Sequence, residues 1–310
     1  MPALISVIMP CFNGGVYLRE AVDSVLSQSY PNVELIVIDD GSTDNSLDIL
    51  AGYGTRITVI RQQNQGPYPA RNKGLQYCHG EYIAFLDADD YWSPQFLREM
   101  AMELEKSGAD VVYCGWQNVG ATHMSAEPYI PPDYNEDHLV ARFIKSCPWP
   151  IHAAVVKGSV VDKLGGFRED FFSSMDFDLW LRMLTVTRKI RRLPEVLAYY
   201  RWHDSGQISS VKWKQVINAW KVRKDFVLGN PELVADIDKK QLSEMIDDAV
   251  KLAAYRAYWD RSLVSARRLF LKTIAIGNWS ARDLKYCLFS FLPARVHACL
   301  DQSITTKTSQ

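Results

Sequence analysis

Four residues at positions 87–90, Asp-Ala-Asp-Asp, have the types and spacing of a cation site. They follow residues 81–86, which have the apolar pattern of a buried strand. Carboxylates a few ångströms apart repel one another, so at least one takes up a proton unless a positive charge lies between them. A divalent ion with oxygen ligands, shared with a phosphate group, neutralises such a cluster. The run therefore predicts a metal–diphosphate site.

A simpler explanation is that these carboxylates only precede a helix. Ser93 and Pro94 are a suitable N-cap and first-turn pair. That explanation accounts for Ser93 and Pro94 but leaves Asp87 and Asp89 unexplained, so we favour the cation site.

Two further acidic pairs have a comparable setting. Asp39 and Asp40 follow a continuously apolar segment at 33–38, although Asp40 with the next Gly-Ser could equally be turn chemistry before a helix. Asp176 and Asp178 lie two residues apart in a helical segment. They cannot share one face of that helix, so at most one of them points at a substrate.

A sheet must position these carboxylates. Strands are predicted at residues 4–9, 33–38, 57–60, 82–86, 110–116, 152–156 and 197–202. Helices are predicted at residues 16–27, 45–50, 69–77, 93–106 and 177–187. The alternation predicts an α/β fold with a doubly wound, mostly parallel sheet, whose ligands bind at the carboxyl ends of the strands.

From about residue 212 the pattern is helical and no strand pattern returns. We therefore predict a catalytic domain at 1–210 and an α-helical C-terminal region at 211–310, which could contact the acceptor, another copy of the chain or a membrane surface. Residues 284–296 combine apolar and basic side chains and could lie on a membrane, although packing against the catalytic domain is the simpler alternative.

The composition excludes several classes of protein. The 310 residues are 47% hydrophobic and 23% charged, with a net charge of −1, so no basic field attracts nucleic acid. Six cysteines without a Cys-x-x-Cys pair favour reduced, packed thiols over zinc or disulfides. The start has no signal-peptide pattern, and no apolar run reaches the roughly 20 residues that span a bilayer. A cytoplasmic protein is predicted, with peripheral contact at the inner face of the membrane left open.

Several ordered motifs together resemble the family 2 glycosyltransferases, which are inverting sugar transferases with the GT-A nucleotide-diphospho-sugar fold. The motifs are ISVIMPCFN, VELIVIDDGSTD, NQGPYPARNKG, EYIAFLDADDYWSP, GGFRED and MDFDLWLRM. The resemblance covers about residues 5–209 and leaves the C-terminal third uncovered.

The resemblance implies a reaction in which an acceptor hydroxyl attacks the anomeric carbon of a nucleotide-diphospho-sugar, usually a UDP-sugar. It implies a divalent metal, Mn²⁺ or Mg²⁺, on the diphosphate. The acceptor would be a glycan or a lipid-linked sugar, most commonly in the biosynthesis of cell-surface polysaccharide. The identity of the sugar, the linkage and the oligomeric state stay open.

By resemblance, the nucleotide-sugar site includes residues at the ends of four elements. They are Pro10, Phe12, Asn13, Asp39, Asp40, Arg71, Asp87 and Ala88. Asp39 would accept the N3 hydrogen of uracil, and Phe12 stands where the family usually has tyrosine and could stack on the base or pack in the core. Arg71 would bind the diphosphate.

The metal and the acceptor are assigned in the same way. Asp89 would ligate the ion, and His203 would complete the metal site or act as a structural hydrogen-bonding group. Asp176 maps onto the family's general base, with an N-cap as its alternative role. Met175 departs from the family, which usually has glutamate there, and Trp149 is expected at the acceptor because aromatic rings cover the apolar faces of sugars.

Three other functions were compared with this one. A catalytically silent subunit that binds sugar nucleotides fits the missing carboxylate at Met175. An aspartyl-phosphate phosphatase also carries Asp-x-Asp, but after its first core strand, whereas here the motif follows the fourth. A dinucleotide-dependent oxidoreductase is disfavoured because no Gly-x-Gly-x-x-Gly follows the first strand.

Overall fold

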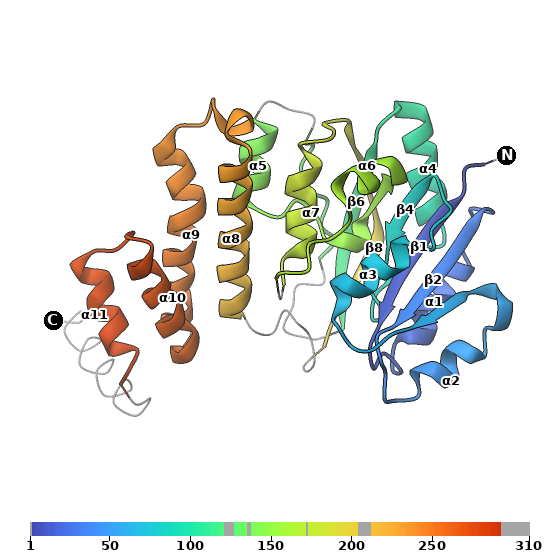
Figure 1. Ribbon diagram of the computed structural model, residues 1–310, viewed down its shortest axis with the longest axis horizontal. Helices are drawn as coiled ribbons and strands as arrows, with labels where there is room; N and C mark the ends of the chain where they lie inside the picture. The colour runs from blue at the N-terminus through green and yellow to red at the C-terminus, as the bar shows by residue number, and fades with distance from the viewer. Residues whose placement is uncertain (1, 121–126, 135–137, 172, 204–211, 293–310) are drawn as a thin grey trace. The chain divides into compact units, whose positions relative to one another are not determined.

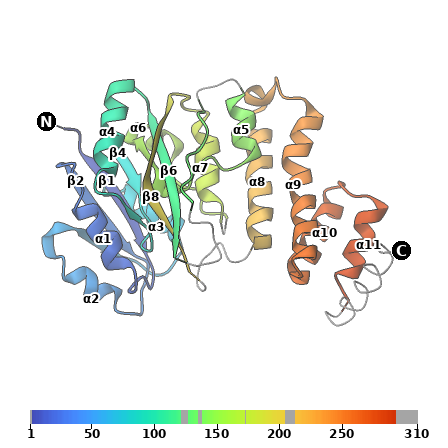
Figure 2. The same cartoon turned by 180° about the vertical axis from the view of Figure 1, so that it is seen from behind.

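A computed structural model describes residues 2–120, 127–134, 138–171, 173–203 and 212–292 of the chain. The chain divides into two compact units, Met1–Phe171 with Met175–Gln207 and Phe172–Ser174 with Ile208–Gln310. The first unit is a sheet with helices, and the second is helical (Figures 1 and 2). The roles predicted for regions 1–210 and 211–310 stay predictions.

Within the described residues, the first unit contains one eight-stranded sheet in the order β3-β2-β1-β4-β7-β6-β8-β5. The strands are β1 (Ile5–Cys11), β2 (Val33–Asp39), β3 (Thr58–Arg61), β4 (Tyr82–Phe85), β5 (Tyr91–Trp92), β6 (Val111–Gly120), β7 (Ala154–Lys157) and β8 (Ile190–Trp202). The first four strands run parallel, as do β6 and β8. β7 is antiparallel to both β4 and β6, and β5 is antiparallel to β8.

Helices cover both faces of this sheet. They are α1 (Leu18–Leu26), α2 (Ser46–Ala51), α3 (Pro67–Leu75), α4 (Phe96–Ser107), α5 (Leu139–Lys145), α6 (Gly158–Leu164) and α7 (Met175–Met183). α3 and α6 lie against one face, and α1 and α4 lie against the other (Figures 1 and 2). Every residue of β1 is therefore buried, which explains its continuously apolar sequence. The predicted fold class is confirmed.

The helix after the acidic run begins later than its sequence indicates. Tyr91 and Trp92 form the short edge strand β5, and the Ser93 N–H donates to the Leu197 carbonyl at 2.9 Å. α4 begins at Phe96. The prediction that Ser93 caps this helix is wrong, because its backbone continues the pairing with β8 instead.

The predicted strand at 152–156 also begins later, at Ala154, because Ile151–Ala153 forms a short 3-10 helix, η2. β8 is longer than the predicted 197–202 and starts at Ile190. Residue 209 and parts of the loops at 120–135 and 203–211 lie outside the described residues.

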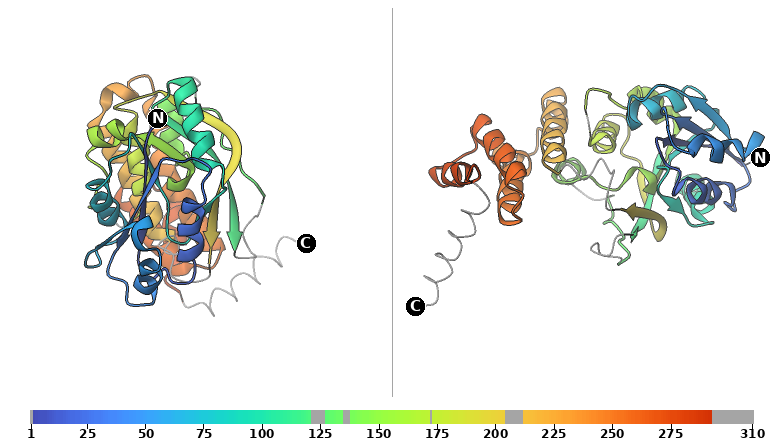
Figure 3. Two further views of the ribbon diagram at one scale, coloured as in Figure 1. Left: turned by 90° about the vertical axis from the view of Figure 1, so that its right-hand side faces the viewer. Right: turned by 90° about the horizontal axis from the view of Figure 1, so that it is seen from below.

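The second unit consists of α8 (Lys212–Gly229), η4 (Pro231–Val234), α9 (Lys239–Trp259), α10 (Leu263–Ala275) and α11 (Ala281–Phe289). α8 packs on α9, and α10 packs on α8, α9 and α11 (Figure 3). Its core is formed by Val250, Ala254, Tyr258, Ala266, Leu269, Phe270 and Cys287. Across the part of the chain that the structure describes, no helix is long and apolar enough to cross a bilayer. Residues 293–296 of the predicted membrane-surface segment lie outside that part.

Candidate active site

The acidic run forms a tight turn between β4 and β5. The Asp90 N–H donates to the Asp87 carbonyl at 3.1 Å and closes the turn. The side chains of Asp87 and Asp89 are 32% and 34% exposed, whereas that of Asp90 is fully buried. The turn therefore presents two of its three carboxylates to a ligand and keeps the third inside the protein.

Arg71, in α3, is the cation opposite the first of these carboxylates. Its guanidinium forms an ion pair with Asp87 although only 4% of the residue is exposed. The rings of Tyr68 and Phe167 lie 5.5 and 5.6 Å from the guanidinium carbon and hold it in place. Among the described residues, the Nε of Arg71 has no hydrogen-bond partner. A buried donor of this kind is suited to an anionic ligand.

Asp89 contacts a histidine from the end of the sheet. Its Oδ2 lies 2.9 Å from Nε2 of His203. Burial raises the pKa of the Asp89 carboxyl and the charge of Asp87 raises it further, while His203 acts in the opposite direction. The ring of Tyr17 lies 5.7 Å from that of His203. The turn thus holds excess negative charge that a further cation would relieve.

Asp89 and His203 could hold a divalent cation only if a bound ligand supplied further oxygen atoms to that cation. Asp89 and His203 supply one oxygen and one nitrogen. In the described ranges, no group of three or more His, Cys, Asp or Glu could hold a metal ion by itself. Phosphate oxygens of a bound nucleotide would have to complete the coordination, as is usual for Mg²⁺ or Mn²⁺ at a diphosphate.

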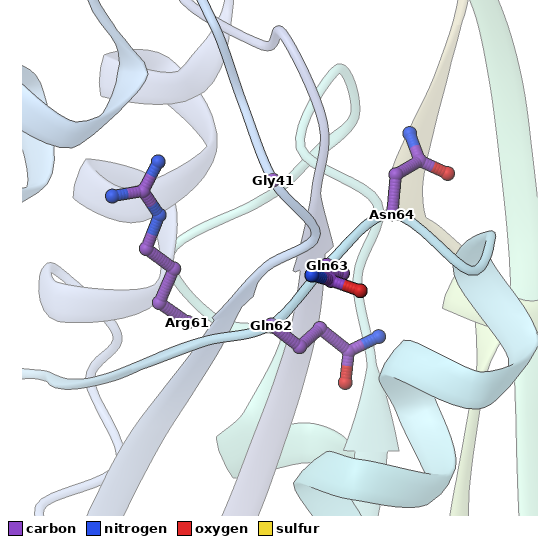
Figure 4. Close-up of a pocket in the computed structure, with 5 residues that line it drawn as sticks. All are labelled: Gly41, Arg61, Gln62, Gln63 and Asn64. Atoms are coloured by element: carbon purple, nitrogen blue, oxygen red, sulfur yellow. The ribbon is translucent and has the colours of Figure 1, made fainter.

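Asp39 ends β2 beside an open pocket of about 520 Å³ that is lined by Gly41, Arg61, Gln62, Gln63 and Asn64 (Figure 4). Its side chain is fully buried, accepts a hydrogen bond from the Ser42 N–H at 3.1 Å, and lies 3.3 Å from the Arg61 Nε. The Arg61 side chain is 63% exposed. A ligand can therefore reach the Asp39 carboxylate if this arginine moves aside.

Asp40 holds the loop that leads into α3. Its two carboxylate oxygens accept hydrogen bonds from the Gln62 side chain at 2.8 Å and from the Gln65 and Gly66 N–H groups at 2.9 and 2.8 Å. Gly66, at φ +94°, then precedes Pro67 at the start of α3. These hydrogen bonds fit the turn role of Asp40, and its contact with a nucleotide sugar stays a prediction.

The loop after β1 packs against the loop after β2. Asn13 adopts a left-handed conformation with φ +51°, and its side-chain oxygen accepts the Thr43 N–H at 2.8 Å. Pro10 is buried within β1, and Phe12 is 50% exposed. A Cβ placed on Gly14 would lie 3.3 Å from the Cβ of Ala88, so this loop closely approaches the acidic turn.

Asp176 lies in the first turn of α7, half-buried, with its Oδ1 accepting the Phe177 N–H at 2.8 Å. Burial raises the pKa of the Asp176 carboxyl, with Arg71 lowering it and Asp87 raising it. Its charge thus interacts with both partners of the Arg71–Asp87 pair. Residues 71, 87 and 176 are far apart in the sequence, yet the charges of the first two act on the carboxyl of the third.

Asp178 points into a different environment. Its carboxylate forms ion pairs with Arg182 at 2.6 Å and Arg168 at 3.6 Å. Arg182 also donates to the Leu164 and Gly166 carbonyls at 2.9 and 2.8 Å. Asp178 therefore fixes α7 to the loop after α6.

Sequence models of two related families match this chain. That of glycosyl transferase family 2 matches residues 6–145, and that of glycosyl transferase family group 2 matches residues 82–293. The second match covers more than half of the chain. The chain belongs to the family 2 glycosyltransferases. This confirms the resemblance that the sequence motifs carry.

Several proteins of known sequence are similar to this glycosyltransferase. An uncharacterized glycosyltransferase of Rickettsia typhi is 34% identical over 208 residues, which is 65% of each chain. The putative teichuronic acid biosynthesis glycosyltransferase TuaG of Bacillus subtilis is 32% identical, over 72% of this chain and 88% of its own. The Escherichia coli protein WfaP, named as a UDP-Glc:alpha-D-GlcNAc-diphosphoundecaprenol beta-1,3-glucosyltransferase, is 31% identical over 71% and 86%. The chain thus spans less than two thirds of the length of the Rickettsia relative.

Two solved structures show the same fold. Staphylococcus aureus TarS in complex with UDP-GlcNAc superposes with a TM-score of 0.66 at 19% identity, over 87% of this chain and 80% of that one. The mannosyltransferase PcManGT of Pyrobaculum calidifontis, in complex with GDP-Man and Mn²⁺, gives 0.57 at 18% identity, over 92% and 78%. At these identities the likeness establishes the GT-A fold alone.

The structure does not place the two predicted acceptor residues of this glycosyltransferase at a surface. Trp149 is 1% exposed and stacks on Tyr113, with ring centroids 4.1 Å apart. Met175 is fully buried. A sugar cannot reach either side chain in this conformation, so an aromatic residue between two prolines was a misleading signal for an acceptor contact.

Residues that the sequence motifs did not single out also build the site. The Arg201 guanidinium lies 4.6 and 5.3 Å from the rings of Tyr17 and Tyr91, and its Nε donates to the Asp89 carbonyl at 2.9 Å. Arg201 stands two residues before His203 in the sequence, and this closeness to a predicted site residue was the available signal.

Proposed function

We propose that this family 2 glycosyltransferase is an inverting, metal-dependent enzyme that uses a UDP-sugar as donor. The observation that best supports the proposal is the Arg71–Asp87 ion pair next to the Asp89–His203 contact, with both charges of the ion pair acting on the carboxyl of Asp176. This arrangement combines a cation for a diphosphate, carboxylates for a metal and a separate carboxylate for proton transfer. Relatives with similar folds support the donor class, since WfaP is named for UDP-Glc and TarS was solved with UDP-GlcNAc.

In this proposal the nucleotide lies along the carboxyl ends of β1, β2 and β4. The uracil N3–H would donate to Asp39, after Arg61 moves aside, and Phe12 would stack on the base. Cytosine lacks that hydrogen, so its N3 would face the buried carboxylate without a donor. Arg71 would pair with the diphosphate in place of, or in addition to, Asp87.

Asp176 would act as the general base. It removes the proton from the acceptor hydroxyl while the hydroxyl oxygen bonds to the anomeric carbon and the bond from that carbon to the diphosphate breaks. Attack from the face opposite the leaving group inverts the configuration. Burial raises the pKa of the Asp176 carboxyl, which makes it a stronger base than an exposed aspartate.

Asp89 and His203 would hold the divalent cation, together with the diphosphate of the donor. When bound, the cation would neutralise the charge that develops on the leaving nucleotide. The raised pKa of Asp89 supports this role, because a carboxyl that is hard to ionise without a partner gains most from one.

The acceptor would be a hydroxyl of a glycan or a lipid-linked sugar in cell-surface polysaccharide biosynthesis. TuaG is named for teichuronic acid biosynthesis, and the name of WfaP specifies a diphosphoundecaprenol-linked acceptor. A lipid-linked acceptor would bring the enzyme to the membrane surface.

The test is a panel of nucleotide sugars incubated with the enzyme, with Mn²⁺, with Mg²⁺ and with a chelator. Release of UDP from one sugar only in the presence of metal is the expected result, and the anomeric configuration of the glycoside product, read by NMR, tests inversion. UDP binding without turnover on any donor or acceptor would instead identify a silent binding subunit. Release of nucleotide that the chelator leaves unchanged would overturn the metal dependence.

A further inference from the structure

The third carboxylate of the acidic turn has no place in the proposed chemistry. Asp90 is 1% exposed and points away from Asp87 and Asp89 into the protein. Its Oδ1 accepts the Arg201 N–H at 2.7 Å. A fully buried carboxyl is costly unless each oxygen has a partner, so its second oxygen must be accounted for.

That second oxygen faces a buried histidine. Oδ2 of Asp90 lies 3.1 Å from Nδ1 of His152, which is 0% exposed. Among the described residues, Oδ2 of Asp90 and both ring nitrogens of His152 form no hydrogen bond, so the two side chains make a close polar contact rather than a hydrogen bond. Burial lowers the pKa of the imidazole to about 4 and raises that of the Asp90 carboxyl. The polar edge of the His152 ring therefore faces the Asp90 carboxyl.

The histidine is itself fixed from two sides. Its ring stacks on that of Tyr200, with centroids 5.4 Å apart and planes inclined by 13°. Its backbone carbonyl accepts the Trp92 side-chain N–H at 2.7 Å. Asp90 and His152 thus connect the acidic turn, which carries Asp89, with β5, with η2 and with β8, whose last residue precedes His203.

An apolar pair of similar volume would fill this space at a lower cost of desolvation. A buried polar pair costs desolvation free energy. Its presence is explained if the pair fixes a geometry that apolar contacts cannot fix. The geometry at stake is the register between the acidic turn and residues Arg201 and Trp202. Arg201 is held twice, by its N–H on Asp90 and by its Nε on the Asp89 carbonyl.

We infer that Asp90 and His152 form a positioning pair, which holds the acidic turn against the end of β8 so that Asp89 and His203 face the same ligand. The inference rests on the proposed function for the identity of that ligand. Neither residue touches the donor, so the pair acts through Asp89 and His203.

Two substitutions of His152 separate this role from a general contribution to stability. Asn places an amide nitrogen where Nδ1 lies, and His152→Asn therefore keeps a polar group next to Oδ2 of Asp90. Gln places its amide where Nε2 lies, and His152→Gln removes this polar contact while keeping a polar side chain. His152→Leu, in which the new side chain has about the volume of histidine, is the apolar counterpart if the Gln variant does not fold.

Hydrogen exchange of the ligand-free protein is the first measurement. In His152→Gln, or in His152→Leu, we expect the protection of backbone amides from hydrogen exchange to fall at least about tenfold at residues 87–92 and 199–203. The protection of the amides in β2 should stay unchanged. His152→Asn should stay within about threefold of the native protein. Unchanged protection of the two segments would overturn the inference, as would an equal loss in β2.

Calorimetric titration with UDP, with and without Mn²⁺, is the second measurement. His152→Gln should weaken binding of UDP with Mn²⁺ at least about tenfold and leave metal-free binding within about twofold, because Asp39, which would bind the base, ends β2 and is not part of the acidic turn. Equal weakening of both would overturn the positioning role. If the native protein binds no UDP, the proposed donor is wrong, and hydrogen exchange still decides whether the pair holds the turn.

Discussion

The change of Asp176 to Asn tests the proposed base while disturbing its surroundings little. Asp176 is half-buried, and its Oδ1 accepts the Phe177 N–H at 2.8 Å. The side-chain oxygen of Asn can accept the same bond, so the rotamer and the start of α7 are retained. What is lost is the negative charge and the ability to take a proton.

The expected cost falls on the chemical step. Removal of a general base slows catalysis by about 10²–10⁴-fold, or about 2.7–5.4 kcal/mol of barrier. Binding of UDP should change little, because Arg71 and Asp39 are untouched. The substitution should slow catalysis but stabilise the fold. The pKa of the Asp176 carboxyl is raised in the folded state, so folding favours the neutral form of this carboxyl. The free energy of unfolding that the neutral carboxyl contributes is complete below the pKa of about 4 that an aspartate has in the unfolded chain. It is lost as the pH rises through the pKa of Asp176 in the folded protein.

Asp176→Asn should therefore melt at a higher temperature than the native enzyme at pH 7, and the advantage should vanish near pH 4. The native kcat should fall as the pH decreases through a pKa that burial raises above that of an exposed aspartate, and this decrease should be absent from the residual activity of the variant. Single-turnover transfer, UDP titration and melting curves at both pH values measure these effects. Native-rate transfer by the Asn enzyme, or a lower melting temperature at pH 7, would refute the assignment.

Three other substitutions test separate parts of the structure. Asp89→Asn should reduce Mn²⁺-dependent donor hydrolysis at least about a hundredfold, and native turnover would contradict the metal role of Asp89. Arg182→Met leaves the buried Asp178 with Arg168 alone and should cost about 3 kcal/mol in urea unfolding; a cost below about 1 kcal/mol would show that Arg168 compensates. Ser280→Ala removes the capping box of α11 and should cost about 1 kcal/mol in thermal unfolding of the second unit, whereas a native melting curve would show that the cap is dispensable.

The sequence predicted the parts of the fold that depend on local pattern. Continuous apolar runs identified β1 and β2 because helices cover both faces of the sheet, and acidic residues marked where β2 and β4 end. The helical texture beyond residue 212 was equally clear, since apolar positions recur there with helical spacing.

The missed features depend on pairing across the fold. The edge strand β5 has two residues and exists because β8 lies beside it, so no local pattern could show it. Trp149 has the composition of an exposed sugar platform, but Tyr113 stacks on it from a distant strand and buries it. The role of His152 was hidden for the same reason, because its partner Asp90 is far away in sequence.

One spacing has opposite consequences at two places in the site. Asp87 and Asp89 are two residues apart where the chain leaves a strand, and both side chains are about one third exposed. Asp176 and Asp178 have the same spacing in α7, where two residues correspond to a rotation of about 200°. Asp178 therefore turns to Arg182 and Asp176 stays beside Arg71 and Asp87. In the proposed mechanism this difference assigns the roles: the carboxylates of the turn face the diphosphate and its cation, whereas Asp176 is the carboxylate of α7 that is left to take the proton of the acceptor, because Asp178 is bound to Arg182.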